Sequence, residues 1–182
     1  MFNKLIKKYP EIYFVLQFLL LFCVFYFGTE FWIGITSKGG YYNAFCEQYL
    51  NYIKWYRLLI LNASVFFCNL FGYKSQVLNN TSVVGFNDFR VTMVYSCIGY
   101  GLLCFWAAFT VTYPTNYKRK LLWFALGFFI LWIANVTRVS LLLVLVNKAK
   151  NVNTFQHHHT TFNIITYLII IVLIYFFTNE KT

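Results

Sequence analysis

The chain has 182 residues, of which 60% are hydrophobic, 23% are aromatic and only 11% are charged. A soluble domain of this length could not cover so much apolar surface, so the composition excludes that class and predicts an integral membrane protein. The formal net charge of +10 would suit a nucleic-acid-binding protein. The basic residues, however, cluster only beside apolar stretches and form no continuous basic stripe. This placement is typical of membrane-topology signals, and it excludes a nucleic-acid partner.

The apolar residues gather in four stretches that are candidates for transmembrane helices. A helix needs roughly 20 residues to cross a hydrocarbon core of about 30 Å. In chain order the stretches are Ile12–Phe27, Ile98–Tyr113, Leu121–Val146 and Phe162–Phe177. Because the chain shows no internal repeat and no low-complexity linker, we expect a single domain over residues 1–182.

Two dense basic clusters lie beside these stretches and predict the orientation. Lys4, Lys7 and Lys8 precede the first stretch, and Lys118–Lys120 follows the second. Basic residues tend to remain on the cytoplasmic side of a membrane, so both clusters are expected in the cytoplasm. The number of crossings between them must then be even, which leaves the segment Ile53–Tyr73 on the outer side.

The segment Ile53–Tyr73 is more polar than the four stretches. Its polar residues include Lys54, Arg57, Asn62, Ser64 and Asn69. The segment is therefore predicted to form an interfacial or partly buried outer helix. The alternative is a fifth crossing, which would place one of the two basic clusters outside.

Strand-like sequence occurs only between residues 75 and 95. Ser75–Leu78 and Phe89–Val94 flank a run of turn-forming residues, which predicts a small hairpin over the outer face. This hairpin would deliver Cys97 to the first turn of a helix that begins at Ile98. The N–H groups and partial positive charge of an outward-facing helix terminus stabilise a thiolate. The sequence thus predicts an all-α polytopic membrane protein with about four transmembrane helices, an outer interfacial helix and a small extracytoplasmic β-hairpin.

Arg138 lies inside the stretch Leu121–Val146, about 12 Å from its outer end at 1.5 Å per residue. Placing an arginine at the centre of a transmembrane helix costs about 2.5 kcal/mol or more, and less toward the ends. Asn135 precedes Arg138 by three residues and shares its face of the helix, where the amide oxygen could orient the guanidinium. Arg138 is therefore a candidate site residue, and an anchor that snorkels to the headgroups is the alternative.

Neither the cysteines nor the histidines predict a metal site or another cofactor. The five cysteines, at positions 23, 46, 68, 97 and 104, are an odd set without CxxC spacing. His157, His158 and His159 are consecutive, and three consecutive imidazoles cannot all face one ion on a regular element. Histidine commonly deprotonates a nucleophilic thiol, so one of the three is a candidate base for Cys97. A polar cluster at the membrane interface is the alternative.

These residues resemble the motifs of a known family, the exosortases and archaeosortases, which are integral membrane cysteine enzymes. Ser96–Gly99 resembles the cysteine motif of that family, and Asn135–Arg138 resembles its Asn-x-x-Arg motif. His159, four residues before Asn163, resembles its histidine. His158 is the rival to His159, because this chain carries three adjacent histidines.

The resemblance implies a membrane-embedded cysteine protease or transpeptidase in the cytoplasmic (inner) membrane, with its active site on the extracytoplasmic side. Its partners would be membrane lipid and secreted proteins with a C-terminal transmembrane sorting signal, which it would cleave. Cys97 would attack the scissile carbonyl to give a thioester, His159 would act as base and then as acid, and Arg138 would stabilise the oxyanion. An amine, a hydroxyl or water would then resolve the thioester.

Two other classes of function stay open. A non-enzymatic membrane scaffold or assembly factor would need none of Cys97, Arg138 and His159. An anion transporter could use Arg138, although the chain shows no inverted repeat for alternating access. The sequence leaves open the substrate motif, the acceptor, the oligomeric state and the choice between His158 and His159.

Overall fold

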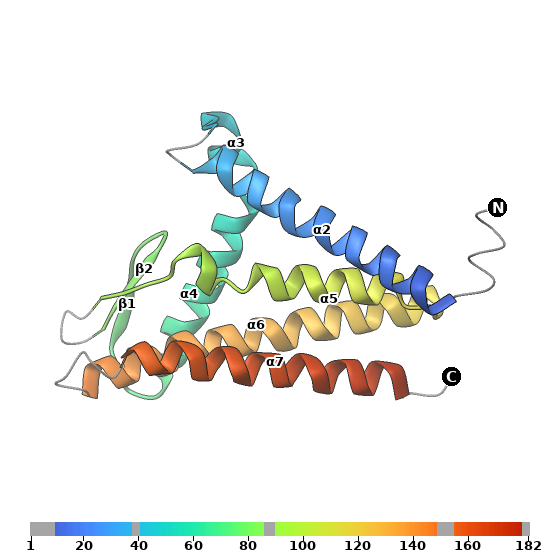
Figure 1. Cartoon of the computed structure of the whole chain (residues 1–182). Helices are drawn as coiled ribbons and strands as arrows, with labels where there is room; N and C mark the ends of the chain where they lie inside the picture. The colour runs from blue at the N-terminus through green and yellow to red at the C-terminus, as the bar shows by residue number, and fades with distance from the viewer. Residues whose placement is uncertain (1–9, 38–40, 86–89, 149–154, 180–182) are drawn as a thin grey trace. The chain divides into compact units, whose positions relative to one another are not determined.

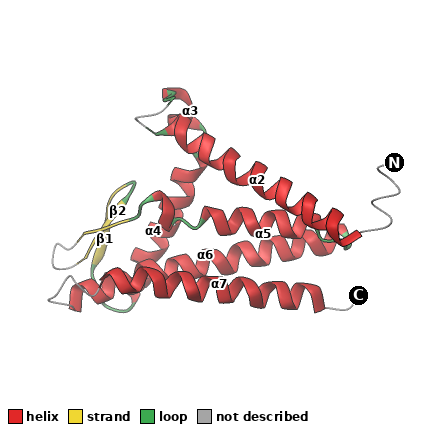
Figure 2. Ribbon diagram, in the orientation of Figure 1, coloured by secondary structure: helices red, strands yellow, loops and turns green. Residues whose placement is uncertain are grey.

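The computed structural model describes residues 10–37, 41–85, 90–148 and 155–179. The described residues form mainly helices, with one small patch of strands (Figure 2). In chain order the elements are α2 (Pro10–Thr36), α3 (Ala44–Tyr49), α4 (Tyr52–Leu70), β1 (Ser75–Asn79), β2 (Ser82–Gly85), β3 (Arg90–Thr92), the 3₁₀ helix η1 (Tyr95–Cys97), α5 (Tyr100–Thr112), α6 (Tyr117–Lys148) and α7 (Phe155–Asn179). The prediction of a mostly helical protein is confirmed.

Three helices of the described residues are long and apolar enough to cross a membrane: Pro10–Thr36, Tyr117–Leu145 and Thr161–Asn179. Helix α5 has 13 residues and is therefore about 20 Å long at 1.5 Å per residue, against a hydrocarbon core of about 30 Å. Helix α4 is not among the three. The chain is a multi-pass membrane protein, while a fourth crossing and the interfacial position of α4 stay predictions.

Helix α2 continues to Thr36, well past the predicted end at Phe27. Two threonines in this extension are compatible with the helix because their hydroxyls bond to carbonyls within it. Thr29 donates its hydroxyl to the carbonyl of Phe25 at 2.8 Å, and Thr36 donates to a carbonyl four residues back in the same way.

The chain forms two compact units, one from the described residues of Met1–Leu50 and Tyr100–Phe128, and one from those of Asn51–Gly99 and Phe129–Thr182. Helix α6 contributes residues to both. In the first unit, α2 and α5 pack through aromatic rings that recur every four residues along α2 and so share one face. The ring pairs include Phe14–Phe109, Phe18–Phe105 and Tyr26–Tyr100, with centroids 6.2, 5.2 and 5.7 Å apart.

The first turns of α6 also belong to the first unit. Helix α6 begins before the predicted Leu121, so the basic cluster Lys118–Lys120 lies inside the helix and not in a link. Trp106 of α5 is almost fully buried and donates its indole N–H to the carbonyl of Trp123 at 3.2 Å. Gly127 lies directly against this indole, which leaves no room for a side chain there.

In the second unit, three antiparallel strands in the order β1-β2-β3 lie beside α4 (Figure 1). The prediction of a two-stranded hairpin is wrong, because β2 lies between the two expected strands and pairs with both. The side chain of Asn79 gives the reason: its Oδ1 accepts a hydrogen bond from the backbone N–H of Thr81 at 2.9 Å. This Asx turn reverses the chain directly after β1, so the residues expected to form one long turn form a strand.

Helix α4 packs against the later part of α6 through small side chains. Ser64 donates its hydroxyl to the carbonyl of Val136 at 3.2 Å, and the Cys68 thiol lies 3.7 Å from the carbonyl of Ser140. Small residues allow two helix backbones to approach closely. The buried residues of α4 are Ile53, Arg57, Ile60, Leu61, Ser64 and Cys68.

Candidate active site

Cys97 is the last residue of η1, the short turn that follows the sheet. The turn is closed by two backbone hydrogen bonds, from Cys97 N–H to the carbonyl of Val94 at 2.9 Å and from Ile98 N–H to that of Tyr95 at 3.1 Å. The thiol is half-buried. The expectation that Cys97 lies in the first turn of an α-helix starting at Ile98 is wrong, because α5 begins only at Tyr100.

Glycine at position 99 causes this break between Cys97 and α5. Gly99 has a φ of 76°, in the left-handed region that interrupts a right-handed helix. The sequence predicted that the amino-terminal end of a helix would stabilise a thiolate at Cys97. The α-helix that this prediction requires does not include Cys97.

Arg138 is the positively charged residue that lies beside Cys97. Its Nη2 donates to the Sγ of Cys97 at 3.6 Å, although the two residues are 41 positions apart in the sequence. The Arg138 side chain is buried, and its guanidinium carbon lies 5.9 Å from the ring centre of Phe162 on α7. The structure thus brings together two of the predicted site residues, and their catalytic roles stay predictions.

No carboxylate occurs among the described residues of this second unit. Of the five acids of the chain, Asp88 and Glu180 lie outside the described residues, and the other three belong to the first unit. A buried cation is costly unless an anion or several hydrogen bonds compensate it. Beside Arg138, the thiolate form of Cys97 would supply such an anion.

Asn135 holds the backbone beside Cys97. Its Nδ2 donates to the carbonyl of Ile98 at 3.0 Å, and the same nitrogen would lie 2.9 Å from a Cβ at position 99. The sequence predicted that the amide oxygen of Asn135 orients the Arg138 guanidinium, and this stays a prediction, because the observed hydrogen bond is made by the amide nitrogen. Asn135 is therefore a positioning residue for the turn.

Tyr56 of α4 places a phenol beside the side chain of Asn135. Burial raises the pKa of Tyr56 to about 12, and the Asn135 side chain offsets part of that rise. The phenol therefore remains neutral at physiological pH. It adds no charge to the surroundings of Asn135.

The three predicted histidines lie in the first turns of α7, which begins at Phe155. The side chains of His157, His158 and His159 lie outside the described residues, so their distances to Cys97 are not part of the observed geometry. Position 159 stays the predicted base, with position 158 as its rival.

Comparison with protein-family models finds a match over residues 10–176 to the family described as Transmembrane exosortase (Exosortase_EpsH). This chain belongs to the transmembrane exosortase family. The resemblance drawn from the cysteine, Asn-x-x-Arg and histidine motifs is confirmed at the level of the family. Searches of curated proteins and of solved structures gave no match.

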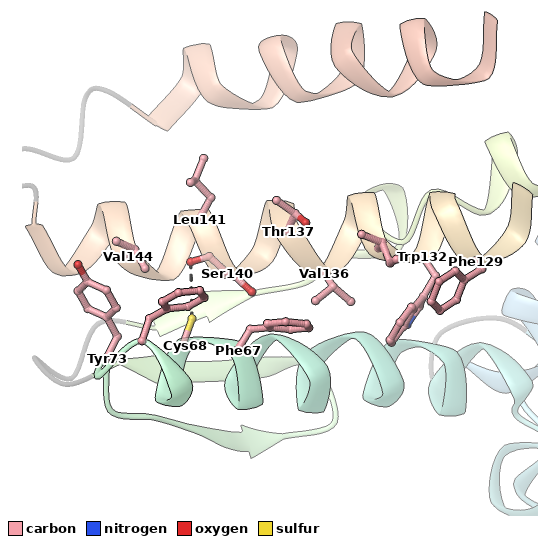
Figure 3. Close-up of a pocket in the computed structure, with 12 residues that line it drawn as sticks. Phe67, Cys68, Tyr73, Phe129, Trp132, Val136, Thr137, Ser140, Leu141 and Val144 are labelled. Atoms are coloured by element: carbon pink, nitrogen blue, oxygen red, sulfur yellow. Dashed lines mark hydrogen bonds between the residues drawn. The ribbon is translucent and has the colours of Figure 1, made fainter. Parts of the chain in front are cut away.

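This exosortase also has an apolar groove between α4 and α6, with a volume of about 480 Å³ (Figure 3). Phe67 and Cys68 line it from α4, and Trp132 and Ser140 line it from α6. Burial raises the pKa of the Cys68 thiol, which makes it a poor nucleophile. Neither Arg138 nor Asn135 lines the groove, so it is separate from the pair at Cys97.

Arg57 of α4 is a buried residue near the site that the sequence did not predict. Arg57 was interpreted as part of the polar character of an interfacial helix, but its side chain is only 6% exposed and faces Tyr95 of η1. The helical spacing of Ile53, Arg57 and Ile60 was the signal that could have found it. These positions share one face of α4, and that face is otherwise apolar or small.

We predict that Gly99→Ala perturbs the site more than a matched change at Gly72. Both glycines have positive φ, so alanine costs roughly 1–2 kcal/mol at either position. Only at Gly99 does the new methyl group meet the Asn135 amide, which adds about 1–3 kcal/mol of overpacking and shifts the turn. Thermal unfolding in detergent and the alkylation rate of Cys97 measure the two effects. Equal losses of stability with unchanged alkylation would contradict the role of Asn135.

Proposed function

We propose that this exosortase is a membrane cysteine transpeptidase or protease that cleaves the C-terminal sorting signal of secreted proteins through a thioester. One observation supports this most directly: a buried guanidinium lies 3.6 Å from the sulfur of Cys97 in a unit without a described carboxylate. The proposed nucleophile is the thiolate of Cys97, whose negative charge would lie beside the Arg138 guanidinium. A scaffold would need neither residue.

In the proposed reaction the thiolate of Cys97 attacks the carbonyl carbon of the scissile peptide bond. A carbon–sulfur bond forms, and the carbonyl oxygen becomes an oxyanion. The oxyanion and the sulfur are then bonded to the same carbon. Arg138 already lies against the sulfur, and its planar fork offers several N–H donors. As the negative charge passes from the sulfur to the oxygen, a second N–H of the guanidinium can donate a hydrogen bond to the oxyanion.

His159 is the proposed proton carrier. It takes the thiol proton when Cys97 becomes a thiolate and gives that proton to the departing amine when the peptide bond breaks. An amine or hydroxyl acceptor, or water, then attacks the thioester, and the same imidazole receives its proton. The thiol of Cys97 is restored at the end of the cycle.

We further propose that the site faces the extracytoplasmic side of the inner membrane. The proposal rests on the basic clusters, because Lys118–Lys120 lies at the beginning of α6 and Arg138 lies toward the other end of the same helix. If the basic end is cytoplasmic, the pair of Arg138 and Cys97 belongs to the outer leaflet. A secreted protein anchored by its C-terminal helix would present its cleavage site there.

The first test replaces the nucleophile. Cys97→Ser should abolish cleavage of a secreted protein that carries a C-terminal transmembrane sorting signal, whereas Cys46→Ser, at another half-buried cysteine, should leave it intact. Cleavage is followed in cells by the mass shift of the substrate. In the wild type, mass spectrometry should find a substrate fragment on Cys97 that hydroxylamine removes. Unchanged cleavage by Cys97→Ser would favour a scaffold or a transporter.

The second test concerns the guanidinium. Arg138→Lys keeps the positive charge but loses the planar fork that can present two parallel donors, so it should not restore activity. Loss of one oxyanion donor typically costs about 2.7–4 kcal/mol, or roughly 10²–10³ in rate. The cleavage rate of the variant measures this loss. A wild-type rate would mean that Arg138 serves only as an anchor.

The third test assigns the base. On a regular helix, positions 158 and 159 share the face of Phe162, whose ring is directed toward Arg138, whereas position 157 lies on another face. His159→Ala should therefore lose about 10²–10⁴ in rate, and His157→Ala should be nearly silent. The rates of the three single alanine variants, His158→Ala included, decide the order. Mild and similar losses in all three would show that Cys97 has no histidine base.

A further inference from the structure

The first unit has a groove of its own, formed by the beginning of α2, the end of α5 and the beginning of α6 (Figure 1). This α2 groove has a volume of about 700 Å³. Helix α2 lines it with Tyr13, Leu16, Gln17, Leu20 and Leu21. These positions recur every three or four residues, so they share one side of the helix. That side adjoins the aromatic rings that pack α2 against α5, and the groove therefore runs beside this helix contact.

Lys120 of α6 is the charged residue among those that line the α2 groove. Its Nζ donates to the carbonyl of Val111, in the last turn of α5, at 2.6 Å. The last four carbonyls of a helix have no partner within the helix, so this hydrogen bond caps α5 and fixes the ammonium at the groove. An ammonium has three N–H donors, and the carbonyl uses one of them. The other two are left for a ligand.

Tyr13 places a second donor at the same end of the groove. The rings of Phe14 and Tyr113 lie 6.3 Å apart, which puts this turn of α2 level with the end of α5. The oxygen of Tyr13 accepts a hydrogen bond from Nε2 of Gln17 at 2.6 Å, so the O–H of the phenol remains able to donate. Glu11 does not line the groove, because at 100° per residue it points about 200° away from Tyr13.

The remainder of the α2 groove is aliphatic. Leu20 lies seven residues beyond Tyr13, which is about 10 Å along the helix axis. The side chains of Leu16 and Leu20 are 60% and 66% exposed, so they are available to a ligand. A cation and a hydroxyl at one end, followed by about 10 Å of aliphatic surface, match an amphiphile with an anionic head and a hydrocarbon chain. A small anion would occupy only the polar end.

We propose that the α2 groove binds one anionic phospholipid of the membrane. Its phosphate contacts the Lys120 ammonium and the Tyr13 hydroxyl, and one acyl chain lies against Leu16 and Leu20. Charge complementarity supports this occupant, since Lys118–Lys120 makes the beginning of α6 basic and basic pockets between transmembrane helices bind anionic headgroups. A peptide is a poorer fit, because the aliphatic part of the groove offers no partners for its backbone N–H and C=O groups.

The experiment measures lipid binding to the full chain in detergent by native mass spectrometry. Phosphatidylglycerol and phosphatidylcholine with the same acyl chains are added at equal concentrations, so the two lipids differ only in the headgroup. We expect the protein to retain one phosphatidylglycerol in preference to phosphatidylcholine. Equal retention of the two lipids would show a contact without selectivity and would overturn the proposal.

Two matched substitutions locate the site. Lys120→Gln should weaken phosphatidylglycerol binding about fivefold, the factor that corresponds to about 1 kcal/mol for a basic residue at a membrane surface. Lys120→Arg should keep the preference. The control is Lys118→Gln, which removes an exposed cation two residues away that does not line the groove, and it should leave binding unchanged. Equal losses in the two glutamine variants would mean that net charge attracts the lipid, which overturns a defined site.

Tyr13→Phe tests the second donor in a protein that keeps the hydrogen bond between Lys120 and Val111. It should weaken phosphatidylglycerol binding by about two- to tenfold, the range expected for the loss of one hydrogen bond. Unfolding temperatures in detergent without added lipid show whether each variant is folded. Wild-type binding in both folded Lys120→Gln and folded Tyr13→Phe overturns the proposal.

A competition arm distinguishes the lipid from a free phosphate. Glycerol 3-phosphate carries the same phosphate but has no acyl chain, so in excess it should leave the bound phosphatidylglycerol in place. If it displaces the lipid from the wild type, the groove is a site for a small phosphate compound and the proposal is overturned. The α2 groove uses none of the residues of the proposed acyl transfer, and these measurements need no turnover. Their outcome is therefore independent of the Cys97→Ser test.

Discussion

The contact between the Arg138 guanidinium and the Cys97 thiol is the interaction on which the rest of the site depends. A guanidinium inside a membrane protein is stable only if something compensates its charge, and no carboxylate is present in the described part of its unit. A thiolate would provide that compensation. In the proposed reaction the same anion would be the nucleophile.

Two residues on a single turn of α6 contact the segment around Cys97. Arg138 reaches the sulfur, and Asn135, three residues earlier, holds the carbonyl that follows Cys97. Both side chains project from the same helix, so one element contacts the turn of Cys97 at two points. Gly99 makes this possible, since its backbone turns away from the helical path and its missing side chain leaves room for the amide.

Two arginines from different helices meet the segment between Tyr95 and Cys97. Arg138 lies against the sulfur of Cys97, and Arg57 lies against the ring of Tyr95. The apolar groove between α4 and α6 is separate from both arginines and lacks their polar character.

The sequence by itself determined the class of the protein, three of its long helices and the identity of the pair Cys97 and Arg138, because composition, apolar length and motif spacing are local properties. It predicted one strand too few, since a single Asx turn at Asn79 decides where the chain reverses. The partner of Asn135, the break at Gly99 and the burial of Arg57 were decided by tertiary structure. Each depends on which helix packs beside which turn, and contacts between residues far apart in the chain leave no periodic signal in the sequence.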